Sequence, residues 1–139
     1  MTERKKILFV CTGNSARSQM AEGFMKVLGG EDWIVQSAGV ITSYVHPLAI
    51  QAMGEIGIDI SQQRSKSLDL FLREKFDVVI TLCDHAARTC PALLGGGQRL
   101  HWPLEDPAGA TGTPEERLKV FRKVRDELKK RIEEFLRAS

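Results

Sequence analysis

Five residues separate a cysteine from an arginine in the segment Cys11-Thr12-Gly13-Asn14-Ser15-Ala16-Arg17-Ser18. A loop of this length can wrap around a tetrahedral anion, with the backbone N–H groups of residues 13–17 pointing inward. The guanidinium of Arg17 can hold two oxygens of such an anion at once. Gly13 and Asn14 tolerate the left-handed backbone that a tight loop needs. The spacing therefore predicts an oxyanion-binding loop made of Thr12, Gly13, Asn14, Ser15, Ala16 and Arg17.

The same loop can turn Cys11 into a nucleophile. A helix predicted to begin near Ser18 directs its positive end at the loop, and together with Arg17 it favours the reactive thiolate form of Cys11. The hydroxyl of Ser18 can donate a hydrogen bond to the sulfur. The alternative is a buried cysteine that merely ends a core strand, because a cysteine and an arginine at this spacing also occur by chance. The flanking strand and helix favour the functional interpretation.

Two further cysteines, Cys83 and Cys90, make three in all. An odd number fits poorly with a secreted disulfide framework, whereas a reducing compartment keeps thiols free. Cys83 and Cys90 could be ordinary buried residues. Three cysteines and His85 could also hold zinc, but the chain lacks the short C-x2–4-C pair of structural zinc sites.

Apolar runs predict four strands. Residues 7–10 and 78–82 are continuous runs that lead into Cys11 and Cys83, which is typical of buried parallel strands. Residues 33–37 and the weaker run 100–102 predict the other two strands.

Helical periodicity predicts three helices around these strands. Residues 18–28 and 47–56 each carry an apolar stripe, and Gly57 is expected to end the second helix. The third begins at a capping box formed by Thr113 and Glu116. We interpret the charged side of this last helix as a solvated face.

Alternation of strands and helices predicts a parallel sheet covered by helices on both faces. A chain of 139 residues fits one domain, so we expect a single α/β domain over residues 1–139 with a four-stranded parallel sheet. Such folds bind their ligands at the carboxyl ends of the strands. Cys11 and Cys83 both fall at such ends.

The chain resembles the low-molecular-weight tyrosine phosphatase superfamily over nearly its whole length, and within it the thioredoxin-coupled arsenate reductases. The segment from Cys83 to Cys90 resembles these reductases most sharply. The other matching segments are residues 11–23, His46-Pro47, 57–61, 81–83, Cys90-Pro91 and 105–107. The resemblance implies a phosphatase-like, Rossmann-like sheet.

The resemblance also implies arsenate reduction by a relay of three cysteines. Cys11 would attack arsenate, Cys83 would attack Cys11 and release arsenite, and Cys90 would move the disulfide outward. Thioredoxin, the electron donor, would then reduce the Cys83–Cys90 bond by thiol–disulfide exchange. A phosphatase has no need of Cys83 and Cys90. The alternatives are a low-molecular-weight tyrosine or small-phosphoester phosphatase with protective extra thiols, and a redox-sensing binding protein.

The resemblance assigns the general acid to Asp106, within Asp106-Pro107. Proton transfer to a leaving oxygen contributes roughly 10²–10⁴-fold to such steps. The alternative is an aspartate in a surface turn, which Asp-Pro also favours. Ala108 stands where phosphatases of the superfamily carry an aromatic residue, and this counts against a phosphotyrosine-selective pocket. We interpret His46 as a helix-entry residue rather than a base.

Many thioredoxin-coupled relatives hold a potassium ion with residues similar to Asn14, Glu22 and Ser37, together with an aspartate. The position of that aspartate is Lys66 in this chain. An ammonium group there would repel a cation, unless Lys66 points into solvent. We therefore expect neither a bound metal nor a bound cofactor.

Composition narrows the partners. A net charge of +2 without a basic stripe argues against nucleic acid, and the longest apolar runs are too short to cross a bilayer. The N-terminal segment lacks the apolar stretch of a signal peptide. We therefore expect a cytoplasmic monomer whose partners are arsenate, with phosphate or sulfate as analogues, and thioredoxin.

Overall fold

Four strands form one parallel sheet in the computed structural model, which describes residues 4–89 and 97–138. Cys90 and Pro91 lie outside the described residues. The strands are β1 (Lys5–Cys11), β2 (Trp33–Gly39), β3 (Val78–Thr81) and β4 (Gln98–His101), in the spatial order β2-β1-β3-β4. This confirms the predicted four-stranded parallel sheet.

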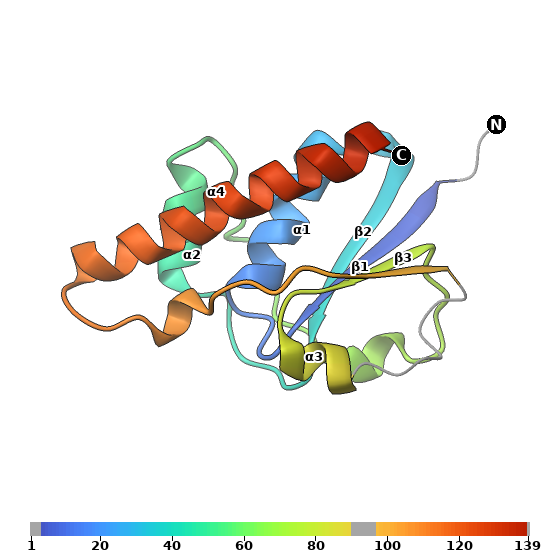
Figure 1. Ribbon diagram of the computed structural model, residues 1–139, viewed down its shortest axis with the longest axis horizontal. Helices are drawn as coiled ribbons and strands as arrows, with labels where there is room; N and C mark the ends of the chain where they lie inside the picture. Colours follow the sequence, from blue (N-terminus) through green and yellow to red (C-terminus); the bar gives the residue numbers. More distant parts are fainter. Residues whose placement is uncertain (1–3, 90–96, 139) are drawn as a thin grey trace.

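Helices cover both faces of the sheet. Figure 1 shows α1 (Arg17–Leu28), α2 (Pro47–Gly54) and α4 (Pro114–Ala138) on one side, and α3 (Asp84–Thr89) on the other. Short 3₁₀ helices occupy residues 30–32, 68–71 and 107–109. The predicted two-faced α/β architecture is therefore confirmed.

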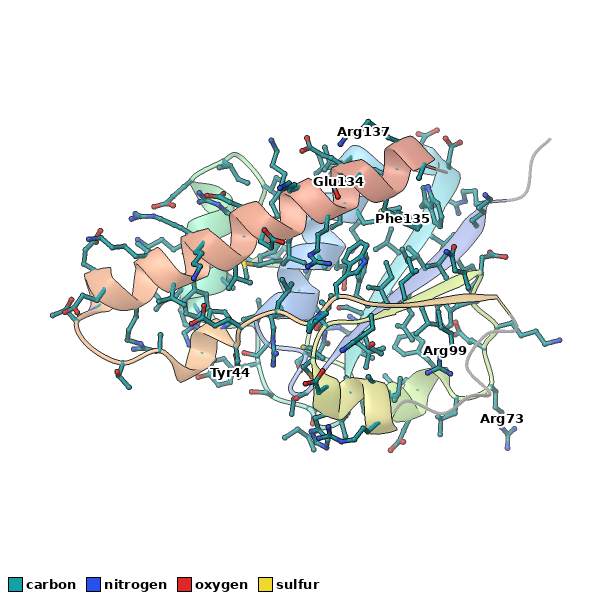
Figure 2. The ribbon with its side chains drawn as sticks, viewed as in Figure 1. Tyr44, Arg73, Arg99, Glu134, Phe135 and Arg137 are labelled. Carbon is teal, nitrogen blue, oxygen red and sulfur yellow. The ribbon has the colours of Figure 1, made fainter. Side chains whose placement is uncertain are left out.

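The core lies between the sheet and α1, α2 and α4. Residues 7–10 of β1 are completely buried, as expected of a central parallel strand covered on both faces. Near the C-terminal end of α4, Phe135 contacts the rings of Trp33 and Trp102, with centroid distances of 5.7 and 6.2 Å (Figure 2). The longest helix is thus attached to the sheet through aromatic contacts at its far end.

Several element ends differ from the predictions by one or two residues. Strand β4 begins at Gln98 rather than residue 100, because the Gln98 N–H bonds the Asp77 carbonyl at 2.8 Å and pairing with β3 sets its extent. Helix α2 ends at Gly54, and Ile56, assigned to its apolar stripe, is 41% exposed. Helix α3 was not among the predicted elements.

The predicted capping box at the start of α4 is confirmed. Glu116 N–H donates to the Thr113 hydroxyl at 3.1 Å, and Thr113 N–H donates to the Glu116 carboxylate at 3.2 Å. The box ends the loop that carries Asp106 and sets the direction in which α4 leaves it. Within the described residues, we find no helix with the length and apolar character needed to cross a lipid bilayer.

Candidate active site

Hydrogen bonds from outside the loop hold the β1–α1 loop in place. The carbonyl groups of residues 11–16 each accept one, from the backbone N–H groups of Val40, Ile41, His46 and Met20, the Ser65 hydroxyl and the Gln19 side chain. In a trans peptide the N–H points opposite to the C=O. Because these carbonyls are bonded outward, the N–H groups of residues 13–17 are turned toward the inside of the loop.

A left-handed residue and a close backbone contact shape this loop. Asn14 has a φ of 48°, whereas Gly13 is not in the left-handed region. Of the two residues expected to tolerate a left-handed backbone, only Asn14 adopts it. Gly39, at the end of β2, is required for a different reason. A Cβ at this position would lie 2.6 Å from the Asn14 nitrogen, so only glycine lets the strand approach the loop so closely.

Cys11 is buried at the end of β1, and Ser18 lies beside its sulfur. The Sγ–Oγ distance is 2.8 Å. The Ser18 oxygen already accepts a hydrogen bond from Asn14 Nδ2 at 2.7 Å, which leaves its proton free to be donated to the sulfur. The structure therefore places a hydroxyl donor against the sulfur of the predicted nucleophile.

Arg17 and Asp106 meet at the opening of the loop. Arg17 is buried, and one of its guanidinium nitrogens donates to the Leu104 carbonyl at 3.2 Å. Another lies 3.6 Å from Asp106 Oδ2. Asp106 is exposed and caps the 107–109 turn by accepting a bond from Ala108 N–H at 3.0 Å. The structure thus brings together the arginine of the loop and the aspartate predicted to be the acid.

Cys83 lies against the outer side of the same loop. Its Sγ is 3.2 Å from Thr12 Oγ1, and Ala86 N–H points at the sulfur from 3.4 Å. This proximity follows from the sheet, because β1 and β3 are neighbours and both strands end at this edge. The structure therefore brings the second predicted thiol to the oxyanion loop. Cys90, the third, lies outside the described residues.

A cavity of about 390 Å³ opens above the loop. Tyr44 is exposed on the loop before α2 (Figure 2). Its ring stacks on that of His46 with a centroid distance of 6.2 Å. An aromatic wall thus comes from Tyr44, although Ala108 is small. The cavity is lined by Cys11, Thr12, Gly13, Ser15, Ala16, Arg17, Ile41, Ser43, Tyr44, His46, Asp106, Ala108 and Arg117.

His46 caps α2, which confirms its interpretation as a helix-entry residue. Its Nδ1 accepts a hydrogen bond from Leu48 N–H at 3.1 Å, so the neutral ring carries its proton on Nε2. Burial lowers the pKa of His46, and the positive charge of Arg117 lowers it further, while Asp106 opposes this shift. His46 is therefore a neutral part of the cavity wall near pH 7.

Lys66 points into the protein, not into solvent. Its side chain is only 15% exposed, and its Nζ lies 3.5 Å from Glu22 Oε1. Glu22 accepts a 2.5 Å bond from Ser37 Oγ, and Ser37 accepts one from Asn14 Nδ2 at 2.9 Å. Burial lowers the pKa of Lys66, while the Glu22 carboxylate opposes that shift. Because an ammonium already faces Glu22, these residues do not fit a potassium ion.

Potassium is therefore expected to have no specific effect on this protein. At equal ionic strength, potassium and sodium chloride should give the same melting temperature and the same Michaelis constant. Lys66→Met removes the internal ammonium and should cost about 1–3 kcal/mol of unfolding free energy. Lys75→Met, at an exposed position, is the matched control and should be neutral. A potassium-specific stabilisation of the wild type would contradict this assignment.

Four residues that line the cavity were not predicted from the sequence, Ile41, Ser43, Tyr44 and Arg117, and the last two bear on its chemistry. Tyr44 lies in a loop without a motif, and Arg117 belongs to the charged side of α4 that was interpreted as a solvated face. That interpretation is wrong for Arg117, which lines the cavity, and for Arg125, which is buried and donates to the Ala52 carbonyl at 2.8 Å. Within the described residues, His, Cys, Asp and Glu nowhere gather in a group of three suited to a metal ion.

Comparison with known proteins places this site in a family. The model of the low molecular weight phosphotyrosine protein phosphatase family matches residues 6–139. The chain belongs to this family. An arsenate reductase from Halalkalibacterium halodurans is 54% identical to this family member over 132 residues, 95% of each chain.

Solved structures agree with this assignment to the phosphatase family. An arsenate reductase in its phosphate-binding state superposes with a TM-score of 0.83 at 44% identity, over 96% of this chain and 98% of the other. A thioredoxin-dependent arsenate reductase from Corynebacterium glutamicum gives a TM-score of 0.73 at 26% identity, over 99% of this chain and 65% of that one. The predicted phosphatase-like fold is confirmed.

Proposed function

We propose that this protein is an arsenate reductase that takes its electrons from thioredoxin. The observation that carries the proposal is the Cys83 thiol, held 3.2 Å from Thr12 at the edge of the loop that contains Cys11. Hydrolysis of a phosphoester needs Cys11, Arg17 and an acid, and has no use for a second thiol. The relatives named arsenate reductase and thioredoxin-dependent arsenate reductase support the same activity here.

In the first step, the Cys11 thiolate attacks the arsenic of arsenate bound in the loop. An S–As bond forms and an As–O bond breaks, and the departing oxygen takes a proton from Asp106 and leaves as water. Arg17 and the inward N–H groups of the loop hold the remaining oxygens and their negative charge. The 3.6 Å approach of Asp106 to Arg17 supports a position for the acid beside the bound anion.

The second step is the reduction. Cys83 attacks the Cys11 sulfur, a disulfide forms, and the S–As bond breaks with its electron pair remaining on arsenic. Two thiols are oxidised and arsenic(V) becomes arsenic(III), which leaves as arsenite. The hydrogen bond from Ala86 N–H to Cys83 Sγ at 3.4 Å supports a fixed position for this sulfur at the edge of the loop.

The third step restores Cys11. Cys90 attacks Cys83 in the Cys11–Cys83 disulfide, which releases the Cys11 thiolate and leaves a Cys83–Cys90 disulfide for thioredoxin to reduce. Seven residues of regular helix span about 10 Å, whereas a disulfide needs its α-carbons within about 7 Å. Since Asp84–Thr89 is helical, we propose that α3 unwinds when this bond closes.

One assay tests the function directly. Arsenate, thioredoxin, thioredoxin reductase and NADPH should give arsenate-dependent NADPH oxidation with one arsenite per NADPH. Omission of thioredoxin should stop turnover. Phosphoester hydrolysis is measured in parallel on the same preparation. NADPH oxidation without arsenite release, or no arsenate dependence, would contradict the proposal.

A phosphatase is the second candidate, and Tyr44 favours it. Its exposed ring at the cavity wall could stack on the aromatic group of a phosphoester, in place of the aromatic residue absent at Ala108. Under this alternative, Cys83 and Cys90 would protect Cys11 from oxidation. Under either activity, we propose a cytoplasmic, monomeric enzyme that needs no metal and no bound cofactor.

A further inference from the structure

Arg117, at the end of the first turn of α4, differs from other arginines of that helix in what its side chain contacts. Arg122 and Arg125 bind Glu55 at 2.6 and 2.9 Å, and Arg131 binds Glu127 at 3.1 Å. Arg117 lines the cavity, and its Nε is buried without a hydrogen-bond partner among the described residues. A buried donor in this state is rare. Unlike the Nε of Arg122, which donates to Glu55, it is not engaged by a carboxylate of the described residues, so the charge of Arg117 is not taken up through this atom.

The other ionisable groups that line the cavity indicate how the positive charge of Arg117 affects ligand binding. Arg17 is positive, the thiolate form of Cys11 is negative, and Asp106 is neutral in the acid form that the proposed first step requires. Without Arg117 these groups carry no net charge. With Arg117 the cavity carries one positive charge, which attracts an anion. The charge of Arg117 acts on other groups that line the cavity, since it contributes to the lowered pKa of His46.

We propose that Arg117 is a specificity-determining residue that makes the cavity prefer doubly charged tetrahedral oxyanions over singly charged ones. The inference deepens the proposed function and rests on its oxyanion-binding step, but not on the redox steps. Arg17 grips the anion through directed hydrogen bonds. Arg117 acts from the outer wall through its charge, so its contribution scales with the charge of the ligand.

Sulfate and perchlorate test this scaling, because they are tetrahedral, redox-inert and carry two charges and one at neutral pH. Each anion should protect Cys11 from iodoacetamide, with the modified peptide quantified by mass spectrometry at constant ionic strength. In Arg117→Met, perchlorate binding should weaken by about fivefold and sulfate binding by about 25-fold, because the Coulomb energy doubles with the ligand charge. Lys130→Met, an equal change of charge at an exposed site farther along α4, should leave both unchanged.

Arg117→Lys is a further variant, because it keeps the positive charge of the side chain and changes its shape. This variant should retain most of the sulfate preference, and its folding serves as a second reference if Arg117→Met loses stability. If Arg117→Met weakened the binding of both anions equally, or of neither, the proposal would be overturned. Protection from alkylation needs neither arsenate nor thioredoxin. The experiment therefore tests the role of Arg117 independently of the reductase assay, and either proposal can fail without the other.

Discussion

Replacing Cys11 by serine is expected to abolish arsenate reduction and phosphoester hydrolysis together. In the proposed mechanism both reactions begin with attack by the sulfur of Cys11, and a serine hydroxyl is a far weaker nucleophile than a thiolate. Removal of a covalent nucleophile typically costs several orders of magnitude, so we expect a loss of roughly 10³-fold or more in both activities. Arsenite release and hydrolysis of a chromogenic aryl phosphate provide the two measurements.

The fold should survive this substitution. Serine is nearly isosteric with cysteine, and the neighbouring Ser18 can bond to either side chain. An unchanged melting profile would show that lost activity reflects lost chemistry. Substantial arsenite release by Cys11→Ser would end the assignment of Cys11 as the nucleophile.

Replacing Cys83 by serine should separate the two activities. Arsenite release should stop at the adduct on Cys11, because no thiol remains at the edge of the loop to attack that sulfur. Phosphoester hydrolysis should be largely unaffected, since it uses Cys11, Arg17 and Asp106. The ratio of reductase to hydrolase activity, measured on one preparation, reports this split without depending on the protein concentration.

Cys90→Ser is the matched control for the order of the relay. It should release about one arsenite per enzyme in a single turnover, set by the stoichiometry of one disulfide per reduction. It should then stall with Cys11 and Cys83 joined. Peptide mapping of alkylated, unreduced protein should find that bond in the variant and a Cys83–Cys90 bond in the wild type.

Hydrogen exchange of backbone amides tests the conformational change proposed for the same relay. If α3 unwinds when the outer disulfide closes, exchange should become faster across residues 84–89 in arsenate-treated wild type and stay unchanged in Cys90→Ser. Full multiple-turnover activity of Cys90→Ser with thioredoxin would contradict the three-cysteine relay, whatever the exchange data show.

The parts of the site that could be predicted from sequence are local. The run 7–10, the loop to Arg17 and the helix behind it are contiguous, and strand, loop and helix each carry their own signal. The position of Cys83 near this loop could also be predicted, because parallel strands end at one edge of the sheet. Each of these inferences needed only a stretch of chain and its periodicity.

Contacts between distant segments could not be predicted in this way. Nothing in the spacing of Lys66 and Glu22 places an ammonium 3.5 Å from the carboxylate, since the contact depends on how residues 64–66 pass the loop. Gly39 is required only because the loop approaches β2. Arg117 resembles its helical neighbours in sequence, and the fold alone determines that it faces the cavity while Arg122 faces Glu55.

Pairing of β1 with β3 also determines which thiols meet first. Thr12 and Cys83 are 71 positions apart in the chain, yet their side chains touch. In an unfolded chain, closing a loop of that length costs about 2 kcal/mol more than closing one of seven residues, so Cys83 would encounter Cys90 roughly 30 times more often than Cys11. In the folded protein, the pairing of β1 with β3 holds Cys83 beside the loop that begins at Cys11. In the proposed relay, the order of thiol attack would therefore be set by the folded topology, and a chain oxidised before it folds would form the outer disulfide without ever having reduced a substrate.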